Sequence, residues 1–249
     1  MDFRSAAGNP ERMPAIAAEA VALKPDVLVT YGTAMTLEAR RLTTTIPVVM
    51  VGAGDPVGTG VVASLTRPGG NITGIASNSA EIAAKRVQLL QEAVPKLTRV
   101  AVLWNTTLQS MALGFQKIET AAPALGVTIE SIRVAGPGDF GRAFAAISAS
   151  RPGGLIALYG PIRGDDLPRI VEFVTRTRPP TVFELGQGVK GGGLMEFGPD
   201  FADAARRVGA YVDKIVNGAR PGDLPIEEPT KFELVLNLKA ARTADRTVE

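Results

Sequence analysis

The stretch Asp26-Val27-Leu28-Val29-Thr30-Tyr31-Gly32-Thr33-Ala34 joins a run of apolar and β-branched residues to the start of a helical pattern. The helical pattern covers residues 34–42, and a second β-rich run, Ile46-Pro47-Val48-Val49-Met50-Val51, follows it. A strand, a crossover helix and a second strand in this order form a βαβ unit, whose two strands lie parallel in one sheet. The stretch therefore predicts an α/β fold in which residues 26–31 form a buried strand.

The same alternation continues along the chain. A first helix is expected over residues 11–23 and a short strand over residues 71–75, after which the pattern restarts. Asn78 and Glu81 resemble a capping pair that opens a helix ending at Val94. Four strands and three crossover helices then form a complete doubly wound half, with the strands over residues 99–104, 127–134, 155–159 and 181–184. Pro123 is expected to kink or shorten the helix before the second of these strands.

A long helix and a final strand follow in the tail. The helix carries one apolar stripe, and the strand is expected over residues 231–238. The first half has too few strands to stand alone, so we expect the tail to return to it. We therefore predict two doubly wound parallel-sheet lobes with a hinge. The predicted segments are 1–75 for the first part of lobe one, 76–196 for lobe two and 197–249 for a tail returning mainly to lobe one, with crossovers near residues 74–77 and 196–199.

The amino-acid composition argues against several classes of function. Of the 249 residues, 45% are hydrophobic and 21% are charged, which is typical of a soluble globular protein. The net charge is +2 with Lys and Arg spread along the chain, so we expect no nucleic-acid partner. The chain contains neither Cys nor His, which argues against a disulfide framework, a thiolate nucleophile and the commonest metal and general-base chemistry. No apolar run approaches the ~20 residues of a membrane-spanning helix.

No motif for a nucleotide cofactor or a nucleophile is complete. In Gly52-Ala53-Gly54-Asp55-Pro56-Val57-Gly58 the third glycine comes one residue late for a dinucleotide loop, and Pro56 removes an amide donor. The sequence has no P-loop and no Gly-x-Ser-x-Gly elbow. Asp165-Asp166 are either paired carboxylates or, as we favour, a helix N-cap. We therefore expect no catalysis, no cofactor and no metal.

Ligand-binding residues are expected at the carboxyl ends of the strands, where open α/β sheets bind their ligands. Gly32, Thr33 and Ala34 follow the first strand, and the amides at this helix start would hold an anionic group such as a carboxylate. Thr33 has the alternative role of capping the helix. Asp55 follows the second strand, where it would meet a ligand amine or form an Asx-type turn. Both alternatives stay open for each residue.

The second lobe offers further candidates at the ends of its strands. Trp104 and Asn105 end one strand, and the Trp ring would stack on a ligand or fill the edge of the core. Tyr159 ends the next strand. Glu184 ends another, and a buried carboxylate needs a partner, either a ligand cation or a protein donor. Aromatic rings and carboxylates facing one cleft would suit an amino-acid-like or amide solute.

Several stretches resemble a known family. They are Thr44-Thr45-Ile46-Pro47-Val48-Val49, Gly54-Asp55-Pro56-Val57-Gly58, Val61 through Gly74, Lys85-Arg86-Val87-Gln88-Leu89-Leu90, Arg99-Val100-Ala101-Val102-Leu103, Gly192-Gly193-Leu194-Met195, Phe197-Gly198-Pro199 and Pro229 through Lys239. Together they cover nearly the whole chain and are similar to the ABC transporter substrate-binding family that includes the binding proteins of tryptophan and tyrosine importers.

The resemblance implies a type I periplasmic-binding fold with a small-molecule solute bound between two lobes. It also implies a membrane permease as partner, a periplasmic location and no catalysis, and we expect a monomer. Members of the family begin with an export signal and a first β-α unit ahead of the segment that matches Phe3-Arg4. Neither precedes that segment here, and the tail from Lys239 is shorter than in the family. Either the start of the chain is mis-assigned or the chain is a truncated copy; in the second case we expect the first lobe to lack one strand and to be the less stable.

Two other functions remain open on the sequence. One is an α/β enzyme acting on a small polar substrate such as a sugar or a nucleotide, which would turn over its substrate rather than bind it stoichiometrically. The other is the ligand-sensing core of a regulator, although no helix-turn-helix segment or basic arm precedes the fold.

Overall fold

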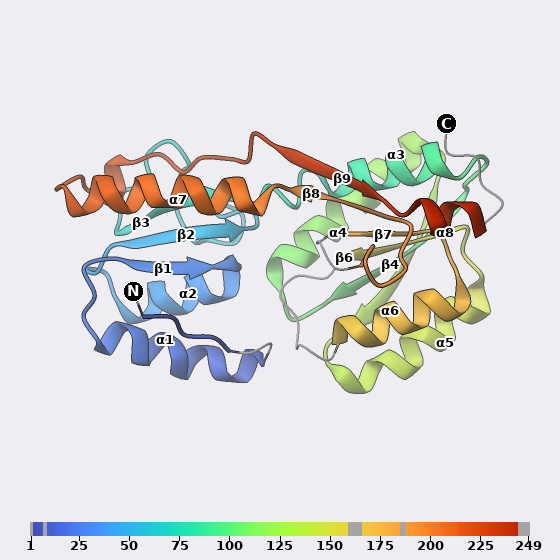
Figure 1. Ribbon diagram of the computed structural model, residues 1–249, viewed down its shortest axis with the longest axis horizontal. Coiled ribbons are helices and arrows are strands. Elements are labelled where there is room, and N and C mark those ends of the chain that lie inside the picture. The colour runs from blue at the N-terminus through green and yellow to red at the C-terminus, as the bar shows by residue number, and fades with distance from the viewer. Residues whose placement is uncertain (1, 7–8, 159–165, 185–187, 244–249) are drawn as a thin grey trace. The chain divides into compact units, whose positions relative to one another are not determined.

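The computed structural model describes residues 2–6, 9–158, 166–184 and 188–243 (Figure 1). The chain divides into two compact units. The first unit is Met1–Ser79 with Pro199–Phe232, and the second is Ala80–Gly198 with Glu233–Glu249. The chain therefore passes from one unit to the other after Ser79, after Gly198 and after Phe232.

The first unit contains a parallel sheet in the order β1-β2-β3. Leu28 pairs with Val48, and Val48 pairs with Ile72, so the βαβ unit expected from the sequence is present. In chain order the elements are a 3-10 helix Pro10–Arg12, α1 Met13–Ala22, β1 Leu28–Tyr31, α2 Gly32–Leu42, β2 Val48–Ala53, β3 Ile72–Ala76, α7 Phe201–Val216 and a 3-10 helix Pro221–Asp223.

Helices α2 and α7 cover opposite faces of this sheet. On one face Val48 and Met50 of β2 pack with Ala39 of α2. On the other face Val49 and Val51 pack with the apolar stripe of α7, which includes Ala204 and Val208. Strand β2 is therefore buried on both sides, as is typical of a parallel strand that reads as a continuous apolar run.

The expectation of a buried strand over residues 26–31 is wrong for β1. Val29 and Tyr31 are each 50% exposed, whereas Thr30 on the opposite face is 3% exposed. The physical reason is the position of β1. It pairs only with β2 among the described strands, and the apolar stripe of α7 packs over β2 and β3 instead. The apolar run therefore predicts the strand correctly but does not predict how far its side chains are exposed to solvent.

The return of the tail extends the first sheet beyond β3. Glu227 forms a parallel bridge with Ile75, and its N–H donates to the carbonyl of Gly74 at 3.0 Å. The N–H of Ala76 donates to the carbonyl of Glu227 at 2.9 Å. Thr73 adds a side-chain bond, because its Oγ1 donates to the carbonyl of Leu224 at 2.8 Å. The tail therefore satisfies the backbone groups on the outer edge of β3.

The second unit contains a six-stranded sheet in the order β5-β4-β6-β7-β8-β9. The pairs from β5 through β8 are parallel. Its elements are α3 Ala83–Ala93, β4 Arg99–Asn105, α4 Gln109–Ala121, a 3-10 helix Ala122–Leu125, β5 Thr128–Val134, a 3-10 helix Pro137–Asp139, α5 Phe140–Ser150, β6 Gly154–Leu158, α6 Asp166–Thr177, β7 Thr181–Phe183, β8 Met195–Pro199, β9 Phe232–Leu236 and α8 Leu238–Thr243.

Alternate residues of the central strands point to opposite faces of the sheet and pack into two separate hydrophobic cores. Val100 and Val102 of β4 point to the core that α3 and α4 cover, and Ala101 and Leu103 point to the core that α5 and α6 cover. All of these residues are fully buried. Figure 1 shows α5 and α6 together on one side of this sheet, with α3 on the other. The doubly wound arrangement expected from the sequence is therefore present in this unit.

One local expectation fails. Helix α3 begins at Ala83, and Asn78 has a φ of 52°, so Asn78 does not open the helix. Of the tail, Pro199–Phe232 lies in the first unit, while β9 lies next to β8 in the second sheet. Helix α4 ends at Ala121, before Pro123, as expected. Within the described residues no helix is both long and apolar enough to cross a membrane.

A first prediction concerns Gly74 in β3. Its φ is 130°, and an added Cβ would lie 2.2 Å from the carbonyl oxygen of Met50 on the neighbouring strand. Because backbone strain and overpacking act together, Gly74→Ala should lower the free energy of unfolding by about 3 kcal/mol. Urea unfolding followed by far-ultraviolet circular dichroism measures the loss.

Gly60→Ala is the matched control. Gly60 has a φ of 73° with no heavy atom within 4 Å of an added Cβ, so only the strain remains. The expected loss is about 1 kcal/mol. Equal losses in the two variants would show that the contact with Met50 carries no cost.

Candidate functional site

The carboxyl end of β1 leads directly into α2. Gly32 is the first residue of the helix and has a φ of 75°, which favours glycine. The N-cap residue, Tyr31, makes no side-chain capping hydrogen bond to α2. The first-turn amides therefore keep the partial positive charge that attracts an anionic group. The three residues proposed from sequence, Gly32, Thr33 and Ala34, all lie in this turn.

Thr33 links the end of β1 to the end of β2. Its Oγ1 accepts a hydrogen bond from the N–H of Gly54 at 3.0 Å. It does not cap its own helix, so the capping alternative for Thr33 is not what the structure shows. Thr36, one turn further along, closes the helix start by donating to the carbonyl of Gly32 at 2.8 Å. The helix start and the loop after β2 are thus held side by side.

Asp55 follows Gly54 in that loop. Its Oδ1 accepts from the N–H of Gly58 at 2.8 Å, and its carbonyl accepts from Oγ1 of Thr59 at 2.7 Å. Its φ of 41° is a conformation that Asp tolerates better than most residues. The turn alternative is therefore realised through Oδ1. Asp55 directly follows Gly54, which Thr33 holds at the start of α2.

Trp104 lies at the edge of the second unit's core. The ring is 8% exposed and stacks on Phe115 with centroids 5.0 Å apart. Its Nε1–H donates to Oγ of Ser131 at 2.9 Å, and the guanidinium of Arg133 lies 5.9 Å from the ring centroid. The indole is thus packed and hydrogen-bonded inside the unit. This is the core role that the sequence left open beside ligand stacking.

Of the two remaining candidates of the second unit, only Asn105 lies among the described residues. Oδ1 of Asn105 accepts from the N–H of Thr107 at 2.9 Å and from its Oγ1 at 2.7 Å, which closes a local turn. Tyr159 lies outside the described residues. So does Asp165, which leaves the choice between paired carboxylates and an N-cap untested, while Asp166 is the buried first residue of α6.

Glu184 meets a protein cation that sequence reasoning missed. Glu184 is 4% exposed and Arg86 is fully buried, with Nη2 of Arg86 lying 3.8 Å from Oε1 of Glu184. Nε of Arg86 donates to the carbonyl of Phe197 at 3.0 Å. Burial lowers the pKa of Arg86, and the charge of Glu184 opposes that change. A clue was present, because Arg86 is a cation on the buried stripe of α3 between Ala83 and Leu90.

A family model described as ABC transporter substrate binding protein matches residues 1–249. The chain belongs to this family. A tyrosine-binding protein from Clostridioides difficile is 23% identical over 248 residues, which are 98% of this chain and 70% of the relative. The resemblance inferred from the sequence motifs is therefore confirmed.

Solved structures place this substrate-binding protein in the same fold. A conserved domain protein from Vibrio cholerae O1 biovar eltor is 26% identical, with a TM-score of 0.90 over 100% of this chain and 83% of that one. An ABC domain from Streptococcus pneumonia, solved in complex with L-Trp, is 22% identical, with a TM-score of 0.89 over 97% of this chain and 83% of that one. The predicted two-lobed α/β fold is confirmed.

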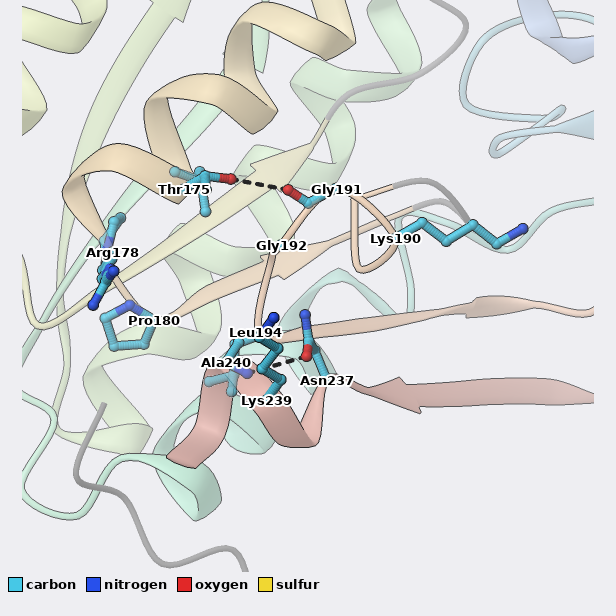
Figure 2. A pocket seen from close by; sticks show the side chains of 12 residues that line it. Thr175, Arg178, Pro180, Lys190, Gly191, Gly192, Leu194, Asn237, Lys239 and Ala240 are labelled. Carbon is cyan, nitrogen blue, oxygen red and sulfur yellow. Dashed lines mark hydrogen bonds between the residues drawn. The ribbon is translucent and has the colours of Figure 1, made fainter. Parts of the chain in front are cut away.

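The second unit of this substrate-binding protein also contains a cavity of about 370 Å³ (Figure 2). It lies at the end of the sheet opposite to Glu184. Pro180 precedes β7 and Leu194 precedes β8, so the cavity is at the amino ends of these strands. Its lining includes the cations Arg178, Lys190 and Lys239, and Figure 2 shows Lys190 extending away from the other labelled side chains. Sequence reasoning named none of these residues. The cavity is not where an open α/β sheet binds its ligand.

The part of the chain that the structure describes contains no group of three or more acidic, His or Cys residues that would hold a metal ion.

Two neighbouring carboxylates, Glu196 on β8 and Glu233 on β9, affect the pH dependence of folding stability. Burial raises the pKa of Glu196, the charge of Glu233 raises it further, and Lys190 lowers it. Glu196 is 9% exposed, so its charged form is poorly hydrated.

A second prediction follows from the raised pKa of Glu196. The folded state binds this proton more tightly than the unfolded state, so the stabilisation is present at low pH and is lost as pH rises through the folded-state pKa. Glu196→Gln should therefore unfold at a higher temperature than the parent protein at pH 7, and the difference should vanish near pH 4. Thermal unfolding across this pH range measures it. Glu172→Gln, which removes an exposed carboxylate from α6, is the control. A gain that is the same at both pH values would contradict the assignment.

Proposed function

We propose that this protein binds an amino-acid-like solute with an aromatic side chain, delivers it to a membrane permease, and catalyses no reaction. One observation carries the proposal. The bond between Thr33 and Gly54 holds the uncapped start of α2 beside Asp55. A partial positive charge next to a carboxylate complements the carboxylate and ammonium groups of an amino acid.

The first unit offers a contact for each part of such a solute. The amides of Gly32, Thr33 and Ala34 would receive its carboxylate. The carboxylate of Asp55 would accept a hydrogen bond from its ammonium group. Tyr31, which is 50% exposed directly before α2 and lies 5.9 Å from Phe201 between ring centroids, would pack against an aromatic side chain.

The second unit contributes in a different way. We propose that Asn105 and Tyr159 also bind the solute, as the sequence predicts. Trp104 and Glu184 instead stabilise the second unit itself, because Trp104 is packed on Phe115 and Glu184 is paired with Arg86.

The relatives support the choice of solute class. One relative is named a tyrosine-binding protein, and a related structure contains L-Trp. We propose a periplasmic location and a monomer, as the family resemblance suggests. The absence of His and Cys from the sequence supports binding without turnover, because the usual general base and the most reactive nucleophile are missing.

A third prediction tests the function itself. In titration calorimetry L-tryptophan or L-tyrosine should bind at a ratio of one per chain, while glucose should not bind. Chromatography of the same mixture after prolonged incubation should recover the amino acid unchanged. Conversion of the amino acid would favour the enzyme alternative, and binding of glucose but of neither amino acid would reject the proposed solute class.

A fourth prediction concerns the charge of Asp55. Asp55→Asn keeps an oxygen that accepts from Gly58 and an amino acid that tolerates a φ of 41°, so the turn should survive. The solute ammonium would lose a charged partner, which should weaken binding by about 10–100-fold. Lys239→Gln, in the cavity at the opposite end of the second sheet, should bind as the parent protein does. The reverse pattern would move the solute to that cavity.

A further inference from the structure

We propose that Arg86 is a positioning residue that fastens two of the three chain crossovers to the second unit, and thereby sets how the crossovers bend when the solute binds. The proposal rests on the proposed function for its link to the solute, and on contacts within the second unit for everything else.

Arg86 lies where the chain enters and leaves the second unit. The chain enters at Ala80, and α3, which carries Arg86, begins at Ala83. The chain leaves after Gly198, and the carbonyl of Phe197, one residue earlier, accepts from Nε of Arg86 at 3.0 Å. One side chain thus connects the helix after the first crossover to the strand before the second.

Glu184 completes this anchor from the end of β7. Its carboxylate pairs with Arg86, and its backbone carbonyl lies against β8. A Cβ added to Gly198 would lie 2.6 Å from that carbonyl oxygen, so only glycine allows β8 to pass so close. The end of β8 is therefore held by a hydrogen bond at Phe197 and by close packing at Gly198.

The charges of this anchor are incompletely hydrogen-bonded. Nη1 and Nη2 of Arg86 and Oε2 of Glu184 are buried and have no hydrogen-bond partner among the residues that the structure describes. The Nη2–Oε1 distance of 3.8 Å exceeds the about 2.7–2.9 Å of a charge-assisted hydrogen bond. Buried charges in this state cost stability, so a structural role alone would favour a tighter pair or apolar residues. A shift of β8 relative to α3 would change the contacts of Arg86 with Phe197 and Glu184, so bending of the crossovers would act on this anchor.

The test uses Arg86→Met combined with Glu184→Leu, which removes both charges together and leaves neither one buried alone. Hydrogen exchange is measured on the protein without solute. We expect exchange in the peptide covering residues 195–201 to be at least tenfold faster than in the parent protein, while the central strands β4 and β6 exchange as before. Affinity for L-tryptophan should fall by about tenfold, with the midpoint of urea unfolding changed little.

Two further variants make the outcome decisive. Lys85→Met with Glu92→Leu removes a pair on the same helix, whose Nζ–Oε1 distance is 3.7 Å and whose side chains are exposed, and it should change neither exchange nor affinity. Arg86→Lys keeps the charge beside Glu184, and therefore the fold, but has no Nε–H donor for Phe197. It should reproduce the faster exchange of residues 195–201.

Unchanged exchange of residues 195–201 in both Arg86 variants would overturn the proposal and leave Arg86 as a packing residue. Because exchange is measured without solute, this result is independent of whether the parent protein binds an aromatic amino acid. Failure of the parent protein to bind either amino acid would reject the proposed solute while leaving the exchange result to decide the role of Arg86.

Discussion

A parallel sheet needs a layer of helix on both faces, because its strands are apolar on both sides. The first unit meets this constraint with residues far apart in the sequence. Helix α2 lies between β1 and β2 in the chain, but the opposite face of β2 and β3 is covered by α7, which begins at Phe201. The chain must therefore leave the first unit, build the second and return. The crossovers, and the hinge that we propose at them, follow from the need to cover β2 and β3.

The same constraint directs binding chemistry to the ends of the strands. With both faces of each sheet occupied by helices, polar groups are accommodated where strands end and helices begin. In the first unit the bond between Thr33 and Gly54 brings two such ends together, so that helix amides and a carboxylate are neighbours. In the second unit the corresponding residues are largely engaged in the protein itself. Trp104 is packed in the core, and Asn105 closes a turn.

Buried and exposed charges differ in their surroundings in this protein. Most of the ion pairs among the described residues have an exposed partner, and each of these contributes little to stability. Arg86 and Glu184 are different, because both are buried and the described residues do not supply all of their hydrogen bonds. Buried polar groups without partners call for an explanation, and the positioning role that we propose for Arg86 is one. The position of the pair, beside the strand that leaves the second unit, agrees with that role.

The sequence by itself determined the type and order of most elements. The apolar runs at residues 26–31 and 46–51, with a helical pattern between them, were sufficient for a parallel βαβ unit, and the motifs from Thr44 to Gly74 were sufficient for the family. These features depend on periodicity and turn chemistry over short stretches, which the chain carries locally. Tertiary structure alone decided the exposure of β1, the place of β9 and the partner of Glu184. The bond from Arg86 to Phe197 spans 111 positions, and no local pattern specifies which distant residue will fill a given space in a core.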